Sequence, residues 1–207
     1  NMRIFDPASS GSWLDQKAAR LQDYVFNEVF LNCLHEGKLK LPQGTGALGD
    51  KETLDFIGLN YYSRDLVSFD LSQSSTLFGR NAPSPDAELS LFGWEVYPEG
   101  IYRLCKRLSG YGRPVFITEN GLPDEDDSQR PRFLLDHLTW LHRAISEGID
   151  VRGYYHWSFI DNFEWAEGYA TPFGLVAFDP VTYERTVKES GRLYAEICRS
   201  GRISAAM

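Results

Sequence analysis

Apolar residues recur at intervals of three and four near the start of the chain, a spacing typical of an amphipathic helix. The pattern covers residues 12–36. Ser12 and Asp15 stand at the spacing of a helix cap, and Gly37 follows the pattern as a stop signal. The apolar positions are Leu14, Ala18, Leu21, Val25 and Val29. We therefore expect one long helix in this part of the chain.

Three later runs are apolar on successive residues, which predicts strands buried on both faces, as in a parallel sheet. They cover residues 55–62, 114–118 and 151–157. Helical spacing between and after these runs predicts three more helices: residues 98–110, residues 128–147, and a last helix that carries Leu193, Tyr194 and Ile197.

The predicted elements alternate between helix and strand along the chain. Such alternation implies right-handed βαβ units and a parallel sheet, so the fold class is α/β. Loops are predicted over residues 38–53 and over residues 63–93, the second with an extended piece around residues 66–69. No linker divides the sequence, so residues 1–207 are expected to form one region.

Composition excludes some classes of function. The chain has 21 Lys and Arg against 29 Asp and Glu, and its net charge of −8 argues against a nucleic-acid partner. No apolar run reaches the roughly 18 residues of a membrane span, and the first residues do not resemble a signal peptide. We therefore expect no membrane partner and, by default, a cytoplasmic protein.

The cysteines and histidines do not form a metal-binding pattern. Cys33, Cys105 and Cys198 are odd in number and far apart, so we expect small buried residues and no disulfide framework. His137 and His142 are five residues apart on a predicted helix and do not share a face. Neither a metal nor a cofactor is expected.

Polar and aromatic residues gather where each predicted strand ends. Active sites of parallel α/β folds are built at these C-terminal strand ends. Any one cluster has an ordinary alternative, a solvated strand end, but three clusters in register favour a site. The clusters are Asn60, Tyr61 and Tyr62; Glu119 and Asn120; and Trp157 with Asp161, Asn162, Glu164 and Trp165.

Glu119 is the strongest single candidate for chemistry. It follows an apolar strand and precedes the turn-forming pair Asn120-Gly121, which places its carboxylate at the mouth of the sheet. A carboxylate there can act as a nucleophile or a general base if a donor holds it ionised and oriented. Tyr62, at the end of a neighbouring predicted strand, is a suitable donor.

Residues 154–173 contain eight aromatic side chains in twenty positions. Some of them, such as Phe159, are expected to pack in the core. The interleaved acidic residues do not suit a dry core, because unpaired buried charge is costly. A sugar site explains the mixture, since indole rings stack on pyranose faces and carboxylates bond the hydroxyls. A nucleotide-stacking surface is the alternative, which the local acidity disfavours.

Four segments resemble one known family. They read DFIGLNYY at 55–62, ITENG at 117–121, HWSFIDNFEWAEGY at 156–169 and FGL at 173–175. In this order and spacing they resemble the family 1 glycoside hydrolases, the retaining β-glucosidases and β-galactosidases. Further matching positions are Trp94, Tyr97, Pro98, Arg185, Lys188 and Ser190. The resemblance implies the C-terminal half of a (β/α)8 TIM barrel and hydrolysis of terminal β-linked sugars.

The resemblance also implies roles by position. Glu119 matches the catalytic nucleophile, Tyr62 the tyrosine that hydrogen-bonds it, and Asn60 a polar residue beside the glycone site. The other matching positions line the sugar site: Glu164 and Trp165 for the hydroxyls, Trp157 as the platform beneath the ring, and Phe173 as a nearby aromatic. The expected substrate is a β-glycoside or oligosaccharide.

The family's general acid/base lies in a Thr-x-Asn-Glu-Pro motif of the first half-barrel, and this motif does not occur here. Asn27-Glu28 is no substitute, because Val29 follows it and it lies inside the first predicted helix. We therefore expect an N-terminal half-barrel polypeptide as partner, and an inactive isolated chain. The alternative is a non-catalytic carbohydrate-binding or interaction half-barrel, such as a homodimer that pairs its own edges.

Overall fold

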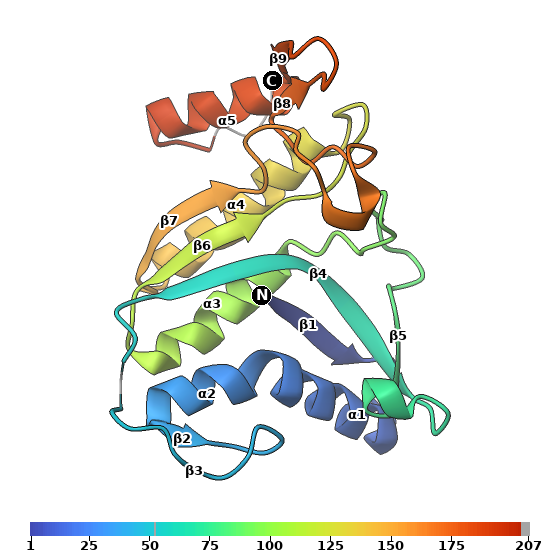
Figure 1. Cartoon of the computed structure of the whole chain (residues 1–207), viewed down its shortest axis with the longest axis vertical. Coiled ribbons are helices and arrows are strands. Elements are labelled where there is room, and N and C mark those ends of the chain that lie inside the picture. Colours follow the sequence, from blue (N-terminus) through green and yellow to red (C-terminus); the bar gives the residue numbers. More distant parts are fainter. Residues whose placement is uncertain (52, 204–207) are drawn as a thin grey trace.

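A parallel sheet forms the centre of the molecule (Figure 1). The computed structural model describes residues 1–51 and 53–203. Its parallel strands lie in the order β1 (Met2–Pro7), β4 (Ile57–Phe69), β6 (Val115–Asn120) and β7 (Val151–His156). A short strand, β5 (Gly79–Ala82), pairs antiparallel with the second half of β4.

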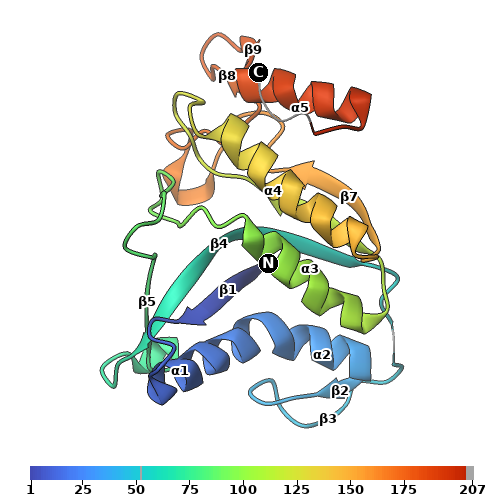
Figure 2. The ribbon, with the colours of Figure 1, turned by 180° about the vertical axis from the view of Figure 1, so that it is seen from behind.

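Helices cover one face of this sheet. Seen from the front, β4, β6 and β7 lie before α3 and α4, and from behind the two helices lie before the strands (Figures 1 and 2). The helices are α1 (Trp13–Asp23), α2 (Val29–Glu36), α3 (Glu99–Leu108), α4 (Arg130–Ser146) and α5 (Glu189–Ser200). There are also two small hairpins: β2 (Lys38–Leu39) with β3 (Gly46–Ala47), and β8 (Val176–Phe178) with β9 (Arg185–Val187).

The core lies between the strands and these helices. Alternate residues of β4 and β6 point into it, and they pack with apolar residues of α3 and α4. Its fully buried members include Leu59, Tyr61, Ile101, Leu104, Val115 and Ile117. Burying each such aliphatic side chain contributes about 1.5–3 kcal/mol. Because strand side chains alternate, the residues between them, such as Asn60 and Tyr62, lie on the opposite, open face.

The first predicted helix is confirmed, with an unexpected turn inside it. The Ser12 hydroxyl accepts a hydrogen bond from the Asp15 amide at 3.2 Å, as the capping spacing predicts. A π-helical turn, Tyr24–Glu28, joins α1 to α2. The Asn27 side chain donates to the Arg3 carbonyl at 2.7 Å and accepts from the Arg3 amide at 3.0 Å. Asn27 therefore binds the backbone of β1, and the pair Asn27-Glu28 lies within the helical segment as expected.

One strand boundary is wrong, and several short strands have no counterpart among the predicted elements. The strand predicted to end at Tyr62 continues to Phe69, and it includes the extended piece expected around residues 66–69. Its polar second half is hydrogen-bonded to β1 on one edge and to β5 on the other. Strand β1 has no separate sequence signal, since it is short and half polar, and pairing with β4 stabilises it. Hairpin β8–β9 was not predicted either.

The cysteine prediction is correct for Cys33 and Cys105, which are buried, and wrong for Cys198. Cys198 lies on the solvent side of α5, so its thiol is exposed. In the part of the chain that the structure describes, no helix combines the length and hydropathy needed to cross a bilayer.

Candidate active site

Glu119 and Tyr62 meet on the open face of the sheet. They lie on the neighbouring strands β6 and β4, and the Tyr62 hydroxyl donates a hydrogen bond to Glu119 Oε2 at 2.5 Å. A hydrogen bond to a carboxylate is both short and strong, so it fixes the direction in which the other oxygen points. The carboxylate and the donor that the sequence predicts to lie together therefore form a hydrogen bond in the structure.

A bulge in β6 turns Glu119 toward the open face. Leu59 pairs with Ile117, but the next residue of β4, Asn60, pairs with Glu119, so Thr118 is an extra residue in the ladder. In a regular strand Thr118 and Glu119 point to opposite faces. Here the Thr118 hydroxyl donates to Asn60 Oδ1 at 2.5 Å, while Glu119 contacts Tyr62 on the same face.

The environment of Tyr62 keeps its hydroxyl protonated. Burial and the hydrogen bond to Glu119 raise the pKa of Tyr62 far above its usual value, and the nearby Glu164 carboxylate raises this pKa further. Tyr62 therefore acts toward Glu119 only as a donor. Glu164 itself is partly buried in the loop that follows β7.

Aromatic rings pack around Tyr62. Its ring contacts Trp94, with centroids 5.6 Å apart, and meets Phe173 edge-on at 6.4 Å. Phe173 is 2% exposed and also packs against Phe92. Sequence reasoning missed Phe92, because a single aromatic residue in a polar loop gives no periodic signal.

Asn120 and Gly121 fix the end of β6 to its neighbouring strands and to the residue that follows β7. The fully buried Asn120 amide donates to the Tyr61 carbonyl at 2.8 Å and accepts from the Tyr154 hydroxyl at 2.9 Å. A Cβ on Gly121 would lie 1.8 Å from the Trp157 carbonyl oxygen, so only glycine fits there. The sequence predicts that Asn120 opens a turn. In the structure Asn120 is instead the last residue of the strand, where it has a structural role.

The loop after β7, residues 157–175, carries the other predicted sugar-site residues, and we call it the aromatic loop. Its two arms are joined by hydrogen bonds between Ser158 and the backbone of Phe173 and Leu175. Trp157 is partly buried at its start, whereas Trp165 near its tip is 84% exposed. The structure therefore gathers Asn60, Tyr62, Glu119 and Phe173 closely, and leaves Trp165 in solvent. The core position expected for Phe159 is wrong, since this ring is 73% exposed.

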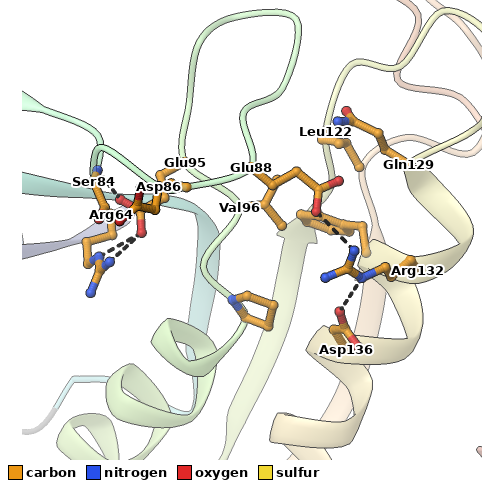
Figure 3. A pocket seen from close by; sticks show the side chains of 13 residues that line it. Arg64, Ser84, Asp86, Glu88, Glu95, Val96, Leu122, Gln129, Arg132 and Asp136 are labelled. Atoms are coloured by element: carbon orange, nitrogen blue, oxygen red, sulfur yellow. Dashed lines mark hydrogen bonds and ion pairs between the residues drawn. The ribbon is translucent and has the colours of Figure 1, made fainter.

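A cavity of about 370 Å³ lies elsewhere, between the segment before α3 and the start of α4 (Figure 3). Five of its six charged lining residues are paired: Arg64 bonds Glu95, and Arg132 lies between Glu88 and Asp136. Neither Glu119 nor Tyr62 lines it. Within the described residues, no group of three or more His, Cys, Asp or Glu is arranged to hold a metal ion.

Parallel strands alternating with helices on one face, with polar residues at the strand ends, define half of a (β/α)8 barrel. The chain belongs to glycosyl hydrolase family 1, whose pattern it matches over residues 7–202.

Known relatives agree with this membership in sequence and in fold. The chain is 38% identical to a β-galactosidase of Sulfolobus acidocaldarius over 198 residues, covering 91% of this chain and 40% of that protein. It is 39% identical to β-glucosidase A of Thermotoga maritima, covering 97% of this chain and 49% of that protein. The solved structure of a β-glycosidase from Pyrococcus horikoshii superposes with a TM-score of 0.91 at 41% identity, covering 99% of this chain and 48% of that one. The chain therefore spans about half the length of these relatives.

Proposed function

We propose that this chain supplies the nucleophile and the sugar-binding residues of a retaining β-glycosidase of the β-glucosidase type. The observation that carries the proposal is the contact between Tyr62 and Glu119 on the open face of the sheet. A carboxylate oriented by a protonated phenol is equipped to attack an anomeric carbon. Solved structures of a family 1 β-glucosidase of Thermotoga maritima, in complex with isofagomine lactam and with deoxynojirimycin, support a glycoside as the substrate class.

In the proposed reaction, a Glu119 oxygen attacks the anomeric carbon while the bond to the leaving oxygen breaks. Retaining enzymes need a second carboxyl group about 5–5.5 Å from the first, which protonates that oxygen and then activates water. We place this acid on an N-terminal half-barrel, in the motif Thr-x-Asn-Glu-Pro. Asn60, Glu164 and Trp165 would bond the sugar hydroxyls, with Trp157 beneath the ring and Phe173 beside it.

The edges of the sheet support a half-barrel as partner. Within the described residues, β1 pairs only with β4, and β7 pairs only with β6, so each has an open edge. The rings of Tyr155, on β7, and of Phe159, in the aromatic loop that follows β7, are 58% and 73% exposed. Unpaired strands and exposed rings of this kind are normally covered.

Covalent labelling tests the nucleophile. A 2-deoxy-2-fluoro-β-glucoside with a dinitrophenolate leaving group needs a nucleophile but no acid, because the phenolate leaves without a proton. We expect mass spectrometry to find one fluoroglycosyl group on the peptide that contains Glu119, and none in Glu119→Gln. Labelling is measured in the chain alone and after mixing with a first half-barrel that carries Thr-x-Asn-Glu-Pro. Absence of label in both, with sugar binding retained, would favour the non-catalytic half-barrel instead.

Hydrolysis itself tests the partner. Dinitrophenyl and ordinary aryl β-glucosides should turn over in the mixture and not with the isolated chain. The intact mass of the purified particle shows directly whether a second polypeptide accompanies this one. A monomeric chain that hydrolyses aryl glucosides by itself would contradict the need for a partner.

A further inference from the structure

The residues Lys188 and Ser190 match the family's sequence but have no part in the reaction proposed above. They lie at the start of α5, next to the aromatic loop. We propose that Lys188 and Ser190 are positioning residues that hold the aromatic loop, so that Phe173 and the sugar-binding side chains keep their places beside Glu119. The inference rests on the proposed function and adds the way in which its sugar site is held.

Lys188 reaches the loop through Asp161. The Lys188 ammonium donates to Asp161 Oδ1 at 3.0 Å, and the side chains of the pair are only 11% and 13% exposed. The same oxygen accepts from the Gly174 amide at 2.7 Å. Lys188 also donates its amide to the Leu175 carbonyl at 3.0 Å. One ion pair thus joins α5 to both arms of the loop.

Ser190 reaches the loop by a second route. Its hydroxyl and amide donate to the two oxygens of Asp127, at 2.7 and 2.8 Å. Asp127 forms an ion pair with Arg130, whose side chain is fully buried. The Arg130 guanidinium in turn donates to the Pro172 carbonyl at 2.9 Å, and the Asp124 amide donates to the same oxygen at 3.0 Å.

The two routes end on either side of Phe173. Lys188 is linked to the Gly174 amide through Asp161. Ser190 is linked to the Pro172 carbonyl through Asp127 and Arg130. The backbone is therefore fixed on both sides of Phe173. A Cβ at Gly174 would lie 2.2 Å from the Asp161 amide nitrogen, so this contact has no room to relax. Phe173 contacts Tyr62, which bonds Glu119. The start of α5 is thereby connected to the carboxylate through packed and hydrogen-bonded groups.

Hydrogen exchange on the full chain tests this connection without relying on activity. A charge-assisted hydrogen bond contributes about 1.5–3 kcal/mol, which corresponds to about a tenfold or larger change in an opening equilibrium. We expect Lys188→Met and Ser190→Ala each to speed amide exchange in residues 157–175 about tenfold or more, with β6 unchanged. Arg185→Ala is the matched control, because Arg185 belongs to the same sequence pattern but is exposed on β9, where its side chain donates to the Tyr183 carbonyl and lies over the Phe178 ring of the same hairpin.

A second measurement separates positioning from general stability. In the fluoroglucoside reaction, Lys188→Met should raise the inhibitor concentration for half-maximal inactivation about tenfold and change the maximal rate less. Asp161→Asn combined with Lys188→Met should recover part of the loss, because the unpaired carboxylate is gone while the amide oxygen still accepts from Gly174.

The inference is wrong if exchange in the loop matches the parent in both variants, or if it rises equally in β6 and α4. If the parent chain takes no label while loop exchange responds as expected, the proposed nucleophile fails and the anchoring of the loop stands.

Discussion

At the scale of single residues, one substitution tests what the hydroxyl of Tyr62 does. This hydroxyl donates to Glu119, and the Tyr62 ring packs on Trp94 and Phe173. Tyr62→Phe keeps the packing and removes the donor. Because a hydrogen bond to a charged group contributes about 1.5–3 kcal/mol, we expect the rate of fluoroglucoside labelling at Glu119 to fall about 10- to 100-fold.

The neighbouring tyrosine provides the control. Tyr61 points to the opposite face, is fully buried, and donates to the Tyr97 carbonyl at 2.6 Å. Tyr61→Phe should therefore lower the stability slightly and leave the labelling rate of the folded protein unchanged. Equal labelling rates in Tyr62→Phe and the parent would contradict the orienting role of Tyr62.

The sequence predicts the members of the site better than it predicts their geometry. Glu119 and Tyr62 are found from strand ends and motifs, because both signals lie in consecutive residues. The bulge at Thr118 has no such signal, since it depends on how β6 pairs with β4. The exposure of Trp165 and Phe159 depends on which other groups pack against the aromatic loop, and the local sequence does not show this packing.

At the scale of elements, β6 meets the aromatic loop where there is no room for a side chain. Gly121 lies against the Trp157 carbonyl, and Trp157 in turn donates its amide to Asn120. Gly121→Ala must push the two segments apart. We expect it to lower the free energy of unfolding by about 3 kcal/mol, as overpacking does, measured by urea denaturation.

Gly110→Ala is the control for this substitution. A Cβ on Gly110, just after α3, meets no atom within 4 Å. Its urea midpoint should therefore stay close to that of the parent. A similar midpoint in Gly121→Ala would show that β6 and the aromatic loop are not tightly joined there.

Elements with a strong periodic pattern were predicted, and elements stabilised by their neighbours were not. Helices α3 and α4 and strands β6 and β7 lie within two residues or so of their predicted ranges. Strand β1 and the second half of β4 have polar residues at alternate or successive positions, so neither shows the apolar run of a buried strand. They form because the two pair with each other. Such long-range pairing is not visible in a local window of sequence.

At the scale of the whole molecule, two buried histidines make stability depend on pH. Burial lowers the pKa of His137 and of His156 to about 3. An unfolded histidine titrates near 6.5, so between about pH 6.5 and pH 3 the unfolded chain binds protons that the folded chain does not. The free energy of unfolding should fall as the pH is lowered through this window, by about 1.4 kcal/mol per pH unit for each histidine.

Carboxylates titrate in the lower part of the same window, so a difference measurement isolates one histidine. His156→Leu should reduce the slope of stability against pH between about pH 6.5 and pH 5 by about half. His142→Gln, at an exposed position of α4, should leave the slope as it is. An unchanged slope in His156→Leu would mean that His156 takes up a proton as readily in the folded chain as in the unfolded chain.

The exposed thiol of Cys198 gives the molecule a natural attachment point. Of its three cysteines, Cys33 and Cys105 are buried, and burial raises the pKa of Cys105 to about 12, so that this thiol stays protonated and unreactive. A maleimide dye should therefore couple to Cys198 alone, on the last turns of α5. The wild-type chain thus accepts a single fluorescent reporter without mutagenesis. Its emission anisotropy would follow, in real time, the assembly of this chain into a larger particle.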